Sequence, residues 1–131
     1  MKKLLVGILF TAAGALSISC GSSSGPGDSS GVPPASTIGS LSSAQAATLC
    51  DWENAKAGGY GRSVTCSDGS ARMSDVNQAE CVAGMNLAGT TRCTTLTVGD
   101  VEGCANAIGT NLCELSSTNA ACANLAACLG Y

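Results

Sequence analysis

Hydrophobic and polar positions recur with a helical period from Leu41 onward, and the first element that they predict is a helix. The segment LSSAQAATLCDWENAKAGG, residues 41–59, starts at serines able to cap a helix and stops at a pair of glycines. Ser42, followed by Gln45 three residues later, has the spacing of a capping box. We therefore expect the first helix to lie within residues 41–59.

Residues 62–73 (RSVTCSDGSARM) instead alternate between apolar and polar side chains, which is the period of a strand. The alternation meets Asp68-Gly69, a dipeptide typical of two-residue hairpin turns. We expect a short β-hairpin here, packed on a helix because a lone hairpin is too small to be stable.

A second helix is expected over residues 74–85. Ser74 is able to cap it, and Gly84 and Gly89 mark the end where it frays. The apolar residues that we expect on its buried face are Val76, Ala79 and Ala83.

Two further helices are predicted near the carboxyl end. The third is expected over residues 97–113, with Thr97 and Asp100 at its cap, and the fourth is expected to start near Ser117. Apolar residues recur every three or four positions in both. The expected buried positions are Val101, Cys104, Ala105, Ile108 and Leu112 in the third helix, and Cys122, Leu125 and Leu129 in the fourth.

These elements predict a mostly α fold, a small disulfide-rich domain of about four short helices with one short β-hairpin. Its core is thin, because aromatic residues make up 3% of the chain and much of the hydrophobic fraction is alanine, which buries little area. Short exported chains with weak cores are usually held by disulfides. We expect disulfides among the eight cysteines that follow residue 40: Cys50, Cys66, Cys81, Cys93, Cys104, Cys113, Cys122 and Cys128.

Eight cysteines allow on the order of a hundred pairings, and spacing does not select among them. We favour Cys113 with Cys122, which would close the turn between the last two helices, and Cys104 with Cys128 further along the same helices. The remaining pairs would then form among Cys50, Cys66, Cys81 and Cys93.

Residues 1–19 have the pattern of a signal peptide. Lys2 and Lys3 give a positive start, and an uncharged apolar stretch follows from Leu4 to Leu16. That stretch is too short for a membrane span, which takes about 20 residues. The chain is therefore expected to be exported.

Residues 20–40 (CGSSSGPGDSSGVPPASTIGS) consist mainly of Gly, Ser and Pro. We expect a flexible linker that holds the domain, residues 41–131, on the order of 25 Å from its anchor.

The residues LSISC, 16–20, resemble the lipobox of bacterial lipoproteins, in which an apolar residue and two small residues precede a cysteine, although Ser17 stands where leucine is usual. The resemblance implies cleavage before Cys20, a diacylglycerol on its thiol and an acyl chain on its new amino group. Lipidation would also explain the odd number of nine cysteines. The alternative is cleavage by the ordinary signal peptidase, which would leave Cys20 as a free thiol.

The chain as a whole resembles the small cysteine-rich lipoproteins of Gram-negative bacteria, particularly the Gly/Ser-linker types of myxobacteria, which lend it no assigned activity. The resemblance implies a membrane partner through the lipid anchor. Gly21 after the cysteine favours the outer membrane, with the domain in the periplasm or on the cell surface.

Charge and composition exclude several classes of function. A chain starting at Cys20 keeps four basic residues against nine acidic ones, so nucleic acid is not an expected partner. The chain has no histidine and no C-x2-C pair, so we expect no metal ligands and no cofactor. Without histidine, neither Ser-His-Asp hydrolysis nor a catalytic thiol at Cys81 is expected, and we predict that the protein is not an enzyme.

Two groups of side chains remain as candidates. Asp51 and Glu53 flank Trp52, but residues two apart on a helix point in different directions, so we expect solvated charges around a core tryptophan. Trp52, Tyr60 and Arg62 form a candidate interaction surface, because aromatic residues and arginine anchor interfaces. The alternative is that Tyr60 folds over Trp52 and enlarges the core.

Two hypotheses for the function follow. The first is a non-catalytic, lipid-anchored envelope or cell-surface protein that acts as a binding module for a partner protein or an envelope component. The second is a small hydrophobic-ligand carrier, because all-α domains with eight cysteines resemble plant lipid-transfer proteins, although the adjacent Cys-Cys and Cys-x-Cys elements of those proteins are missing here.

Overall fold

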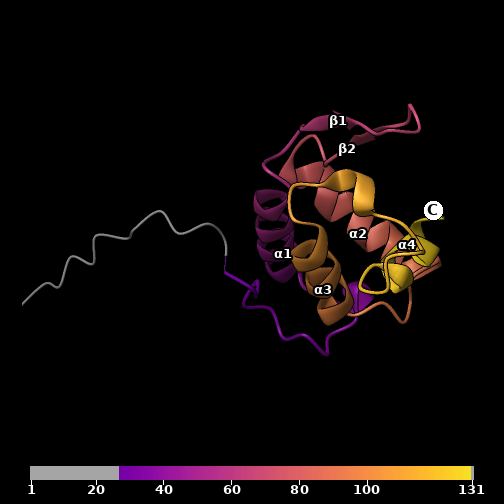
Figure 1. Ribbon diagram of the computed structural model, residues 1–131. Coiled ribbons are helices and arrows are strands. Elements are labelled where there is room, and N and C mark those ends of the chain that lie inside the picture. Colours follow the sequence, from indigo (N-terminus) through magenta and orange to yellow (C-terminus); the bar gives the residue numbers. More distant parts are fainter. Residues whose placement is uncertain (1–26, 131) are drawn as a thin grey trace, which may run out of the picture.

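The computed structural model describes residues 27–130, which form a small domain of helices and one antiparallel hairpin (Figure 1). The predicted fold class, mostly α and disulfide-rich, is confirmed. The predicted signal peptide and Cys20 lie outside the described residues. In chain order the elements are η1 (Ile38–Ser40), α1 (Ser43–Lys56), β1 (Ser63–Thr65), β2 (Ala71–Met73), α2 (Gln78–Thr91), α3 (Val98–Ile108), η2 (Leu112–Glu114) and α4 (Ala123–Leu129), where η marks a 3₁₀ helix.

The predicted caps start two of the helices. Ser42 accepts a hydrogen bond from the backbone N–H of Gln45, and the Gln45 side chain accepts one from the backbone N–H of Ser42, so the predicted capping box precedes α1. Thr97 and Asp100 form the same arrangement before α3. These bonds satisfy N–H groups of the first turn, which have no partner within the helix.

Helix α2 begins later than predicted, and a different residue caps it. The Oδ1 of Asn77 accepts from the backbone N–H of Glu80 at 3.0 Å. Ser74 instead closes the hairpin, because its hydroxyl donates to the carbonyl of Gly59 at 2.8 Å and accepts from the backbone N–H of Arg62. The predicted buried face is wrong, because Val76 lies before the helix and Val76, Ala79 and Ala83 are all exposed.

The hairpin pairs β1 with β2 in antiparallel register, with Ser63 opposite Met73. Its loop has three residues rather than the predicted two, because the backbone N–H of Cys66 donates to the carbonyl of Ser70. Gly69 occupies the last loop position with a φ of 82°, the left-handed conformation that a three-residue loop requires there.

Helices α3 and α4 are shorter than predicted. Helix α3 ends at Ile108, since Gly109 leaves the helical conformation with a φ of 50°. Residues 117–122 form turns, so α4 starts only at Ala123. The predicted apolar positions are nevertheless mostly buried, at Val101, Cys104, Ala105, Leu112 and Cys122.

Residues 27–40 do not form the predicted linker but pack against the helices. Val32 and Ile38 are buried in the hydrophobic core. The backbone N–H of Ile38 donates to the carbonyl of Leu96 at 2.9 Å, and the N–H of Ser30 donates to the carboxylate of Glu102 at 2.6 Å. We call residues 27–40 the N-terminal strap. The linker prediction is wrong for these residues because two apolar side chains and backbone hydrogen bonds suffice to fix them.

Four disulfides join all eight predicted cysteines. Their pairs are Cys50–Cys81 between α1 and α2, Cys66–Cys113 between the hairpin and η2, Cys93–Cys128 between the segment before α3 and the end of α4, and Cys104–Cys122 between α3 and the start of α4.

Both favoured pairs, Cys113–Cys122 and Cys104–Cys128, are therefore wrong. Cys113 belongs to η2 rather than to α3, and it faces the hairpin instead of α4. Cys122 and Cys128 lie at opposite ends of α4, about 9 Å apart along the helix axis. Cys104 bonds Cys122 before the helix, and Cys128 at the other end bonds Cys93.

The strap and α2 approach each other so closely at Gly39 and Gly89 that neither position has room for a side chain. A Cβ atom on Gly89 would lie 2.5 Å from the Gly39 nitrogen, and one on Gly39 would lie 2.6 Å from the Gly89 carbonyl oxygen. Gly89 is thus buried within α2 rather than at the frayed end that we predicted. The glycine pair sets the distance between the strap and the helix.

Replacing Gly89 tests this contact. Gly89→Ala is expected to lower the free energy of unfolding by about 1–3 kcal/mol, because the new methyl group meets backbone atoms that cannot rotate away. The control is Gly84→Ala in the same helix, where a Cβ would meet nothing within 4 Å; it is expected to raise the free energy by up to about 1 kcal/mol. Urea unfolding with the disulfides intact measures both, and equal stability of the two variants would contradict the contact.

Candidate functional site

The residues predicted to form an interaction surface are held by contacts within the domain. Trp52 is 8% exposed, and its Nε1 donates to the carbonyl of Gly27 at 2.7 Å. The Tyr60 hydroxyl donates to Asp51 Oδ1 at 2.9 Å, and Arg62 donates to two backbone carbonyl groups. Each of the three therefore has an internal partner, and their use as an interaction surface stays a prediction.

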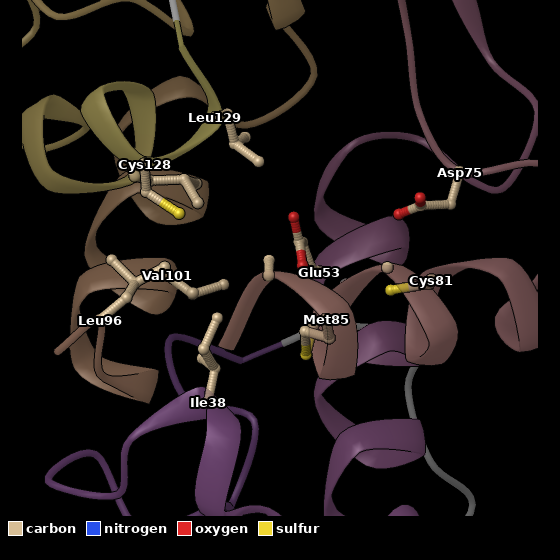
Figure 2. Close-up of a pocket in the computed structure, with 12 residues that line it drawn as sticks. Ile38, Glu53, Asp75, Cys81, Met85, Leu96, Val101, Cys128 and Leu129 are labelled. Atoms are coloured by element: carbon tan, nitrogen blue, oxygen red, sulfur yellow. The ribbon is translucent and has the colours of Figure 1, made fainter. Parts of the chain in front are cut away.

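Asp51 and Glu53 point to different surroundings, as their helical spacing predicts. Asp51 accepts hydrogen bonds from the Tyr60 hydroxyl and from Gln78 Nε2. Glu53 instead projects into a cavity between the helices (Figure 2). Glu53 is therefore not one of the solvated charges that we expected around Trp52.

The cavity that Glu53 enters has a volume of about 200 Å³ and lies among η1, α1, α2, α3 and α4 (Figure 2). Its lining is mostly apolar and includes Met85 of α2, Val101 of α3 and Leu129 of α4. Cys81 and Cys128 line it as well, each as one half of a disulfide. We call this space the helix cavity.

A second cavity of about 270 Å³ adjoins the helix cavity and extends toward β2 and η2. It too has a mostly apolar lining. The residues that line both spaces are Glu53, Asp75, Val101, Leu125 and Leu129. The two cavities therefore meet at a boundary that includes both carboxylates and three apolar side chains.

Asp75, in the segment between β2 and α2, points its carboxylate toward Glu53 (Figure 2). Asp75 Oδ2 accepts a hydrogen bond of 3.5 Å from Asn54 Nδ2, whereas no group of residues 27–130 donates one to the Glu53 carboxylate. The pKa of Glu53 is raised from 4.5 to about 7, mainly by burial and secondly by the negative charge of Asp75. Sequence reasoning missed this pair because only the tertiary fold brings Asp75 to α1.

The pKa of Glu53 predicts a pH-dependent effect on stability. The folded protein keeps the Glu53 proton up to about pH 7, whereas the unfolded chain releases it near pH 4.5, so the folded state binds more protons between these values. This group therefore contributes less to stability as the pH rises from 4.5 to 7, and its contribution levels off above about pH 8.

Glu53→Gln removes the titration. Its free energy of unfolding relative to the wild type is expected to rise between about pH 4 and pH 8, as measured by urea unfolding of both proteins. Glu114→Gln, at an exposed glutamate outside both cavities, is the control. A difference that does not change with pH would contradict the environment assigned to Glu53.

The chain matches no protein-family model, no curated protein and no solved structure. Within residues 27–130, no helix combines the length and the apolar character needed to cross a membrane. In the same part of the chain, no three His, Cys, Asp or Glu side chains are grouped so that they could hold a metal ion. The candidate site therefore rests on the geometry of the two cavities and their carboxylates.

Proposed function

We propose that the protein is a non-catalytic binding module that takes a small, largely apolar ligand into the helix cavity. The observation that carries the proposal is an apolar cavity whose charged groups are confined to Glu53 and Asp75. Small-molecule sites have this composition, an apolar lining with a few polar groups that orient the ligand. Of the two hypotheses from the sequence, the cavity supports the hydrophobic-ligand carrier over the module for a partner protein.

The size of the cavities agrees with a small ligand. Ligand sites usually measure about 300–1,000 Å³, so the helix cavity, at about 200 Å³, suits a short chain or a single ring. Leu129, which lines both cavities, is 45% exposed, and Met73 of the second cavity is 63% exposed. These side chains would give an apolar ligand a route from solvent.

The disulfides support a cavity that exists before the ligand arrives. Cys50–Cys81 joins the two helices that carry Glu53 and Met85, and Cys93–Cys128 fixes the end of α4. A preformed site binds more tightly because little conformational freedom is lost on binding.

The proposal includes no catalytic residue and no cofactor. The chain has no histidine to act as a base, and all eight cysteines of the described part are in disulfides and are not nucleophiles. A binding role needs neither group.

We further propose that the protein is exported and anchored by lipids on Cys20, in the outer membrane. Four disulfides support an oxidising compartment. Of nine cysteines, the eight that the structure describes are paired with one another, which leaves Cys20 for acylation. Because the strap packs from Gly27 onward, the chain between Cys20 and Gly27 would span at most about 25 Å, and the domain would stay close to the membrane.

Hexanol, a neutral apolar probe, tests the ligand proposal. It is expected to shift the backbone amide NMR signals of residues around the helix cavity, such as Gly84 and Met85. Leu125→Trp, which would fill the space where both cavities meet, is expected to abolish the shifts. Leu87→Trp, at a side chain that is 66% exposed and outside both cavities, is the control and is expected to preserve them. Shifts that persist in a folded Leu125→Trp protein, or a wild-type protein whose signals shift with neither hexanol nor hexylamine, would contradict the proposal.

A further inference from the structure

The charge of the helix cavity indicates the chemistry of its ligand. Glu53 and Asp75 bring two carboxylates to it. None of the basic side chains of residues 27–130 lines the helix cavity or the second cavity, neither Lys56 nor any of Arg62, Arg72 and Arg92. An apolar space with two carboxylates and no basic group is complementary to a positive charge.

Lys56, which is on the same helix as Glu53, is held elsewhere. Its Nζ lies 3.5 Å from the carboxylate of Asp28 and 5.4 Å from the centre of the Trp52 ring. These contacts place it on the side of α1 that faces the N-terminal strap, so it does not neutralise the cavity.

We propose that the ligand is an apolar organic cation, such as an alkylamine, whose charged group lies between Glu53 and Asp75. This inference rests on the proposed function, because it names the class of ligand for the same cavity. The apolar body of the ligand would pack on side chains such as Met85, Val101 and Leu129.

An independent observation beside the carboxylates points to the same class. Asn54 lines the second cavity and is 2% exposed, yet its Oδ1 has no hydrogen-bond donor among the described residues. The Nδ2 of the same amide donates to the carbonyl of Cys50 at 3.0 Å and to Asp75 Oδ2 at 3.5 Å. Because both partners are acceptors, the amide orientation is fixed, and Oδ1 is a buried acceptor without a donor on a side chain that also contacts Asp75.

An ammonium group matches these acceptors. It offers up to three N–H donors and no acceptor. Its positive charge would oppose the two effects that raise the pKa of Glu53, which are burial and the charge of Asp75. A carboxylate ligand would add a third negative charge, and a neutral ligand would leave the repulsion between Glu53 and Asp75 in place. The cavity therefore discriminates between ligands by charge.

Hexylamine, hexanol and hexanoate are matched probes, since one alkyl chain carries a positive, a neutral or a negative group. In the wild-type protein, hexylamine is expected to bind more tightly than hexanol, and hexanoate more weakly, as measured by amide NMR titration. The titratable groups that line the two cavities are Glu53 and Asp75, because the lining cysteines are disulfide-bonded. Hexylamine is expected to bind about tenfold more tightly at about pH 8 than at about pH 6, because the ionised fraction of Glu53 rises about tenfold.

Substitution of the carboxylates separates this inference from the proposed function. Glu53→Gln is expected to lower the affinity for hexylamine by about tenfold or more at about pH 8 and to change the affinity for hexanol by no more than about twofold. Asp75→Asn is a second variant with the same expected direction, and Glu114→Gln is the control. Equal affinity of hexylamine and hexanol in the wild type would overturn the inference and leave the proposed function standing. Binding of neither probe would overturn both.

Discussion

The four disulfides hold together elements that are too short to be stable through their own contacts. Helix α4 has seven residues and each strand has three, below the lengths at which isolated helices or hairpins persist in water. Within residues 27–130, the largest side chains that are fully buried are Leu49, Val98, Cys50, Cys104 and Cys122, and three of these are disulfide halves. Each disulfide contributes about 2–4 kcal/mol to the free energy of unfolding, so the cross-links supply much of the stability that the thin core does not.

This covalent support explains how the domain tolerates a cavity with two carboxylates. An apolar space beside Glu53, a half-buried carboxylate to which no group of residues 27–130 donates a hydrogen bond, is costly in a small protein. Here the walls of that space are joined by Cys50–Cys81 and Cys93–Cys128, which keep α1, α2 and α4 in place without filling the gap. Cys81 and Cys128 thus both line the helix cavity and cross-link the elements around it.

Local signals in the sequence predicted much of the fold, whereas contacts between residues far apart in the sequence could not be predicted. The caps at Ser42 and Thr97 act within one helical turn, so sequence spacing identifies them. The composition of the strap indicated a linker, because two buried side chains, Val32 and Ile38, and a backbone hydrogen bond to Leu96 leave no periodic pattern. The site was predictable to the same extent. The helical spacing predicted that Glu53 and Asp51 point in different directions, but no local pattern indicates that Asp75 lies near Glu53. Nor does any local pattern indicate which cysteines pair.

Peptide mapping by mass spectrometry of the non-reduced protein, extracted from the membranes of the cells that make it, tests this covalent framework most directly. The predicted result is four linked peptide pairs and an amino-terminal peptide that begins at acylated Cys20. The predicted pairs are Cys50–Cys81, Cys66–Cys113, Cys93–Cys128 and Cys104–Cys122. A disulfide that contains Cys20, or any other pairing of the eight, would contradict the framework on which the helix cavity depends.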